Sequence, residues 1–318
     1  MKYKVLWIDD EPNDCFIVEA DSYNMDIHVE TCYNKGIEWL RVNRDICMAV
    51  ILDVKCKITD DPNEGDRSDA FKEKRDEISF LCQQDYIIPW FVYTAGDFEG
   101  VEELNFLPIN KIYDPGHRYY KKSEDLNVML ENIKRAIENR EIVSYYKKYD
   151  KVIDFCPQMA RELFRIITIV EKNDFTNTSA FNDMRKVIGW ATAYMRDHGL
   201  LPSSVIRITS ASYYLKNINF RAKQIVPNYI SYGYNTCEDV CNNGSHGKME
   251  GSTDDTNNLI VDELVDSGKA PYLIRSTFYE LLNILSWCKT LPTTDEEIKA
   301  LQSKIINLKI PFDPNKPN

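Results

Sequence analysis

The sequence contains no run of about 18 apolar residues, so no segment is predicted to span a bilayer. Its opening stretch, MKYKVLWIDD, reaches acidic residues before the apolar core of a signal peptide could form. We therefore expect a cytoplasmic protein with no membrane partner.

Paired cysteine motifs are also missing. The 9 cysteines are an odd number at irregular spacing, and no two of them form a Cys-x-x-Cys motif. Disulfide frameworks and zinc modules normally show such pairing. The expected state is therefore reduced thiols, most of them buried.

Concentrated positive charge is absent from both halves. Residues 1–149 contain 20 Lys and Arg against 30 Asp and Glu, and residues 150–318 contain 19 against 20. Acidic surfaces repel phosphate, and a major-groove reader normally carries a basic helix. Nucleic acid is thus disfavoured as a partner, and a DNA-binding domain is not expected.

A chain of 318 residues is long enough for two domains. Apolar runs of strand-forming residues occupy 3–8 and 48–54, a third run ends at Thr94, and a fourth ends near Lys122. Helix-like stretches, such as 35–43 and 125–140, lie between them. This alternation predicts a doubly wound α/β domain with a parallel sheet over residues 1–140.

Beyond residue 140 the alternation gives way to helical patterns at 157–171, 181–197, 211–224 and 271–290. Residues 141–318 are therefore predicted to form a mostly α-helical effector or interaction domain. A segment starting at Lys134 is predicted to run as one continuous helix from the first domain into the second.

Polar residues follow the predicted strands at the ends where a parallel sheet places its ligand site. They are Asp9 and Asp10, Asp53, Thr94 and a lysine pair, Lys121 and Lys122. Three carboxylates near one point favour a divalent cation such as Mg²⁺. A lysine and a threonine can hold phosphoryl oxygens while the central aspartate attacks phosphorus.

The segments KVLWIDDEP, AVILDVK, FVYTAGD and YYKKSEDLNVMLENI resemble, in order, the four marker segments of the response-regulator receiver family. The resemblance covers about residues 1–140 and implies a flavodoxin-like fold. It implies that Asp9 and Asp10 bind Mg²⁺, that Asp53 is both a metal ligand and the phosphorylated residue, and that the Lys55 main-chain carbonyl is a further ligand. Thr94 matches the hydroxyl residue that contacts the phosphoryl group.

The family pattern also selects one lysine. It places an aromatic residue three positions before the lysine and apolar residues seven, eight and eleven after it. Counting from Lys122 gives Tyr119, Met129, Leu130 and Ile133, whereas counting from Lys121 gives Arg118, Val128, Met129 and Asn132. Lys122 is therefore predicted to correspond to the lysine of the family that contacts the phosphoryl group, and Tyr119 to its aromatic switch residue.

Two features depart from the family pattern. Ser123 stands where the family usually has proline. The polar segment 55–77 is predicted to be an extended loop that leads into a helix and lengthens the chain between Asp53 and Thr94. Both departures bear on how readily Asp53 is reached and switched.

The second half contains one weak chemical signal. Cys237, Cys241 and His246 offer soft ligands, but buried cysteines are favoured over a zinc site. The segment 242–247 is predicted to be a glycine-rich loop, in which His246, with Ser245, is a candidate acid or base.

Two functions remain at this point. The first is a two-component response regulator, phosphorylated at Asp53 by a sensor histidine kinase or phosphotransfer protein with Mg²⁺, that switches the helical domain. The alternative is a non-phosphorylated docking module that carries an enzymatic or toxin-like effector centred on His246. A homodimer is possible with either function. With the first function, no enzymatic activity is predicted beyond phosphoryl transfer to Asp53.

Overall fold

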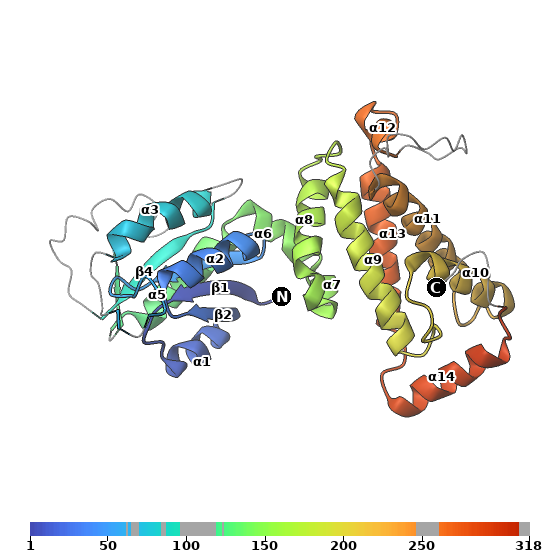
Figure 1. Ribbon diagram of the computed structural model, residues 1–318, viewed down its shortest axis with the longest axis horizontal. Helices are drawn as coiled ribbons and strands as arrows, with labels where there is room; N and C mark the ends of the chain where they lie inside the picture. The colour runs from blue at the N-terminus through green and yellow to red at the C-terminus, as the bar shows by residue number, and fades with distance from the viewer. Residues whose placement is uncertain are drawn as a thin grey trace. The chain divides into compact units, whose positions relative to one another are not determined.

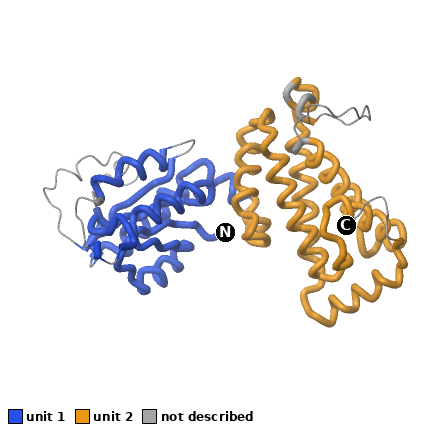
Figure 2. The backbone as a smooth tube through the Cα atoms, in the orientation of Figure 1, with its two compact units in different colours: residues 1–148 blue, residues 149–318 orange. Residues whose placement is uncertain are grey.

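The computed structural model describes residues 1–61, 63–64, 70–83, 87–95, 119–122, 124–245 and 261–311. The chain divides into two compact units, residues 1–148 and 149–318 (Figure 2). The described part of the chain contains no helix that is both long and apolar enough to cross a membrane.

Unit 1 is an α/β unit built on a five-stranded parallel sheet. The strands are β1 (Tyr3–Ile8), β2 (Met25–Glu30), β3 (Cys47–Leu52), β4 (Trp90–Thr94) and β5 (Tyr120–Lys121). They are ordered β2-β1-β3-β4-β5, and every neighbouring pair is parallel. All six residues of β3 are buried, as expected for a central strand covered on both faces.

Helices cover both faces of this sheet, since a parallel crossover carries the chain over one face or the other. The helices of unit 1 are α1 (Asp14–Ser22), α2 (Tyr33–Asn43), α3 (Ala70–Gln83), α5 (Leu126–Glu138) and α6 (Glu141–Lys148), of which α6 follows α5. Apolar residues of α2 and α3 form one core with Leu6 and Val50. On the other face, Phe16 of α1 contacts the Trp7 ring, with 4.2 Å between ring centroids. Figure 1 shows α3 and α1 on opposite sides of the strands.

The continuous helix expected from Lys134 is a wrong prediction. Helix α5 ends at Glu138 and α6 begins at Glu141. Between them, the buried Arg140 donates its N–H to the Ile137 carbonyl at 3.1 Å and its guanidinium to the Met48 carbonyl at 2.9 Å.

The compact units divide between Lys148 and Tyr149 rather than near residue 140. Helix α6 belongs with unit 1 because Lys147 Nζ lies 3.2 Å from Glu138 Oε1 of α5. Glu138 Oε1 also accepts a hydrogen bond from the Tyr3 hydroxyl of β1 at 2.8 Å.

The described residues of unit 2 form helices and connecting turns. The helices are α7 (Asp150–Phe155), α8 (Ala160–Glu171), α9 (Ser179–Asp197), α10 (Ile208–Arg221), α11 (Asn228–Ser245), α12 (Val261–Asp266), α13 (Leu273–Cys288) and α14 (Asp295–Asn307), with a 3-10 turn at Pro157–Met159. Helix α9 packs against α8, α11 and α13, and its Thr192 hydroxyl lies 2.5 Å from the buried Tyr234 hydroxyl of α11.

A glycine allows α14 to approach the end of α9. Gly199 has φ of +80°, and a Cβ at this position would lie 2.8 Å from the Ile298 carbonyl oxygen. Any larger residue would meet both a strained backbone and the main chain of α14.

One further prediction fails in unit 2. Residues 242–245, predicted to lie in a loop, form the last turn of α11. Cys237 and Cys241 lie one turn apart on the same helix, and both are buried, in agreement with the expectation of buried cysteines. Helix α14 has no counterpart in the predicted elements, because of its residues only Ile305 is buried and its apolar pattern is correspondingly weak.

The expectation of reduced, mostly buried thiols agrees with the structure. All nine cysteines are free, and each of them except Cys15 on α1 is buried. Burial raises the pKa of the Cys241 thiol to about 12, and the neighbouring carboxylate of Glu238 adds to this while Arg185 opposes it.

Candidate functional site

The candidate site lies where β1 and β3 end. Asp9 and Asp10 follow Ile8, the last residue of β1, and Asp53 follows Leu52, the last residue of β3. The Asp53 N–H donates to the Ile8 carbonyl at 2.9 Å, and the Asp9 N–H donates to the main-chain carbonyl of Glu30 at 3.0 Å. These bonds extend the sheet pairing by one residue and fix the main chain at Asp9 and Asp53.

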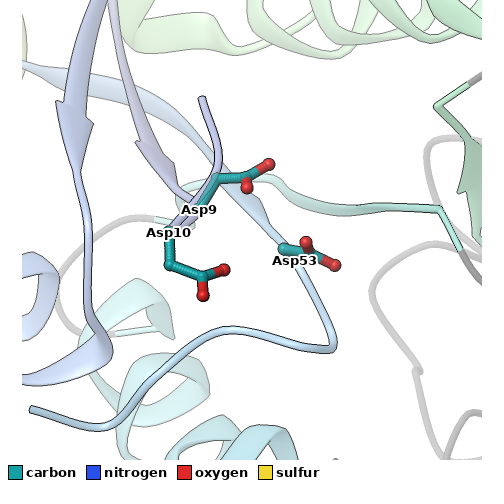
Figure 3. Close-up of side chains that lie close together, drawn as sticks. All are labelled: Asp9, Asp10 and Asp53. Atoms are coloured by element: carbon teal, nitrogen blue, oxygen red, sulfur yellow. The ribbon is translucent and has the colours of Figure 1, made fainter. Parts of the chain in front are cut away.

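The three aspartates form one acidic cluster (Figure 3). Each offers a carboxylate oxygen, and these oxygens lie within 4.8 Å of one another. Asp9 and Asp53 are buried, with 0% and 5% of their surface exposed, and Asp10 is half-buried. Within the described residues, this is the one group of acids, histidines and cysteines placed closely enough to hold a metal ion.

Lys122 brings a positive charge to this cluster. Its Nζ lies 2.6 Å from Asp9 Oδ2 and 2.7 Å from Asp53 Oδ2. The main chain is held by a bond from the Lys122 N–H to the Thr94 carbonyl at 3.0 Å, which continues the pairing of β4 with β5. The Tyr93 hydroxyl also donates to the Lys122 carbonyl at 3.0 Å.

Burial and mutual charge shift the ionisation of these groups. Burial raises the pKa of Asp9, the hydrogen bond from Lys122 opposes that shift, and the Asp53 charge adds to it. Burial alone would lower the pKa of Lys122, but its hydrogen bonds to Asp53 and Asp9 outweigh burial, so its pKa is raised. Lys122 therefore stays protonated at neutral pH, and three carboxylates against one ammonium leave the site net negative.

The donor set fits a hard divalent cation such as Mg²⁺, which prefers carboxylate oxygens and retains waters. The oxygens already accept bonds: Asp9 Oδ1 from the Glu11 N–H at 3.0 Å, and Asp53 Oδ1 from the Lys55 N–H at 3.2 Å. Each ionised carboxylate has about four acceptor positions, so capacity for a cation remains.

A buried hydroxyl lies at the end of the neighbouring strand. Thr94, the last residue of β4, is fully buried, and its Oγ1 has no hydrogen-bond partner among the described residues. Leaving a buried hydroxyl unpaired costs about 1–3 kcal/mol. Such a group is available to an incoming acceptor oxygen.

The structure accounts for the remaining predicted residues as follows. Tyr119 is half-buried and packs against the core formed with α2 and α3, and the side chain of Lys55 is exposed. Ser123, His246 and the predicted irregular segment 96–118 lie outside the described residues. The alternative centred on His246 therefore stays a prediction.

Sequence reasoning missed one residue that contacts the site. Tyr33, the first residue of α2, donates its hydroxyl to the main-chain carbonyl of Asp53. No signal identifies it, because a tyrosine at the start of a helix 20 positions before Asp53 resembles any core aromatic.

Comparisons of the chain with protein-family models, with curated proteins and with solved structures found no match.

Proposed function

We propose that unit 1 is a receiver domain of the response-regulator type, in which Asp53 accepts a phosphoryl group with the help of Mg²⁺. The observation that carries this proposal is the position of the Asp53 carboxylate. It lies within 2.7 Å of the Lys122 ammonium and beside the carboxylates of Asp9 and Asp10, at the carboxyl ends of parallel strands.

The strand order supports the same assignment. The order β2-β1-β3-β4-β5 is that of flavodoxin-like doubly wound sheets. In such a sheet the chain leaves β1 for one edge and returns to β3 on the other side, which opens a crevice between them. The acids that follow β1 and β3 border this crevice, the usual ligand site of the fold.

The chemistry follows from the residues. An Asp53 Oδ atom attacks the phosphorus of an acyl or histidyl phosphate donor, a P–O bond forms, and the donor leaves with the electrons of the bond that breaks. Lys122 and Thr94 then donate hydrogen bonds to phosphoryl oxygens. Asp9, Asp10, Asp53 and the Lys55 carbonyl would hold Mg²⁺, which would supply positive charge to the transferring group.

We further propose that the phosphorylated state alters the face formed by Thr94 and Tyr119, and that unit 2 is the output of this switch. The donor in the cell would be a sensor histidine kinase or a phosphotransfer protein in the cytoplasm. Unit 2 is taken as the output because it is a separate compact unit that follows unit 1 in the chain.

The test is intact-mass spectrometry of the full chain after incubation with acetyl phosphate and Mg²⁺. We expect one phosphoryl group on the wild type and none on Asp53→Asn. Asp21→Asn on α1, where an exposed carboxylate pairs with Lys2, is the matched control and should be modified like the wild type. A wild type that gains no mass, or an Asp53→Asn variant that gains as much, refutes the proposal.

A further inference from the structure

The loop that follows Asp53 folds back onto the beginning of α2. The Tyr33 N–H donates to the Lys57 carbonyl at 2.9 Å, and the Asn34 N–H donates to the Ile58 carbonyl at 3.0 Å. The first N–H groups of a helix have no partner within the helix. At α2 the N-cap residue Cys32 makes no side-chain capping bond, so carbonyls of the loop take that place.

Tyr33 is attached to this loop at two points. Its N–H holds Lys57, and its hydroxyl donates to the carbonyl of Asp53. The side chain is fully buried in the core shared with Val54 and Cys56. Burial raises the pKa of Tyr33 well above its ordinary value, with further contributions from Cys56 and Asp53, so the hydroxyl remains a donor over the working pH range.

The outer part of the same loop is also held. The Glu64 carboxylate accepts the Ile58 N–H at 3.2 Å and the Thr59 N–H at 2.8 Å, and Asp60 forms an ion pair with Lys35 of α2. The segment 53–57 is therefore held at both ends, by the bond to Asp53 and by the bonds of Lys57 and the residues that follow it. That segment contains Lys55, the residue whose carbonyl is expected to ligate Mg²⁺.

We infer that Tyr33 is a positioning residue of the metal site, which holds the main chain of residues 53–57 so that the Asp53 carboxylate and the Lys55 carbonyl face one cation. This inference rests on the proposed function for its metal. It adds a residue that is neither a ligand nor a phosphoryl contact, and it gives the extended loop a role in metal affinity.

The test uses Tyr33→Phe in the full chain and measures Mg²⁺ affinity by calorimetry. This change removes only the hydroxyl, so the ring still fills the core. Loss of one hydrogen bond of ordinary strength should raise the Mg²⁺ dissociation constant on the order of fivefold. Amide exchange of residues 53–58 without Mg²⁺ should also become faster, because the anchor at Asp53 is gone.

Tyr3→Phe is the matched control. Tyr3 is also buried in unit 1, and its hydroxyl also donates a hydrogen bond, to Glu138. It begins β1, at the end of the strand away from Asp9. This variant should lose stability like Tyr33→Phe and keep wild-type Mg²⁺ affinity. Such a result separates positioning from a general loss of stability.

The outcomes distinguish the two proposals. If Tyr33→Phe and Tyr3→Phe bind Mg²⁺ as the wild type does, the positioning role is refuted and phosphorylation of Asp53 is untouched. If the wild type binds Mg²⁺ and Tyr33→Phe binds it more weakly, yet acetyl phosphate leaves Asp53 unmodified, positioning stands and the receiver function fails. A wild type that binds no Mg²⁺ refutes the positioning role together with the metal site.

Discussion

Removing the Lys122 ammonium is the most informative single perturbation of unit 1. Lys122→Met keeps most of the stem and deletes the charge that lies within 2.7 Å of both Asp9 and Asp53. Two buried carboxylates are then left without their cation, a change that typically costs about 3–5 kcal/mol. The Lys122 side chain is 23% exposed, so water already screens part of the interaction, and we expect a loss of about 2–3 kcal/mol at pH 7.5.

The loss should depend on pH, with a sign set by Asp9. The pKa of Asp9 in the folded state is raised above its ordinary value, so between those two values the folded chain binds more protons than the unfolded chain. Stability from this group therefore increases as the pH falls through the folded pKa. Without Lys122 that pKa rises further, so Lys122→Met should lose less stability at pH 5.5 than at pH 7.5.

Mg²⁺ should compensate for the missing ammonium. A cation bound by the folded state alone stabilises it by about 1.4 kcal/mol at ten times its dissociation constant. With one positive charge fewer competing in the site, Lys122→Met should bind Mg²⁺ more tightly than the wild type. Its gain in stability at a given Mg²⁺ concentration should be correspondingly larger.

The assay is hydrogen exchange followed by mass spectrometry of peptides that cover β1 and β3, because it reports the opening of unit 1 separately from unit 2. Lys121→Met, the adjacent and partly buried lysine, is the control and should cost less than about 1 kcal/mol. Equal protection of Lys122→Met and wild type at pH 7.5, or a loss that is the same at pH 5.5, would show that the ammonium does not stabilise the acidic cluster.

Three further variants test contacts in the two units. Thr94→Val replaces a buried hydroxyl that has no partner among the described residues, so the free energy of unfolding of unit 1 in denaturant should stay the same or increase by up to about 1 kcal/mol. The response of the variant to beryllofluoride should weaken. A loss of stability above about 2 kcal/mol would mean that the hydroxyl is already bonded. Gly36→Ala would place a Cβ 2.2 Å from Ile8 Cδ1 and should destabilise unit 1 by about 1–3 kcal/mol. In Gly189→Ala on α9, the added Cβ meets nothing within 4 Å, so this variant should stabilise unit 2 by about 0.5–1 kcal/mol. Equal effects of the two alanines on thermal unfolding would contradict the packing of Ile8 against α2.

The sequence predicts the parts of unit 1 that are fully buried and apolar. The runs before Asp9, Asp53 and Thr94 read clearly as strands because a central parallel strand is apolar on both faces. Strand β2, an element that sequence reasoning did not identify, has the alternating sequence MDIHVE and is half exposed at the edge of the sheet. An edge strand loses the continuous apolar signal that identifies its neighbours.

The spacing of apolar residues after the lysine pair predicts which face of α5 is buried. Counting from Lys122 selects Met129, Leu130 and Ile133, and all three are fully buried, whereas Val128, selected from Lys121, is 45% exposed. The pattern therefore identifies the buried face of α5. It says nothing of Tyr33, because hydrogen bonds from a side chain to a distant main-chain carbonyl leave no periodic trace in a sequence.

The distribution of thiols has a practical consequence for experiments on this protein. Since each cysteine except Cys15 is buried, a maleimide dye applied to the folded wild type should attach at that one residue. Cys15 lies in the first turn of α1, next to Phe16, whose ring lies 5.5 Å from Tyr93, the residue before Thr94. The native chain thus provides a single fluorescent attachment point on unit 1, a short distance from the strand end where a switch would begin.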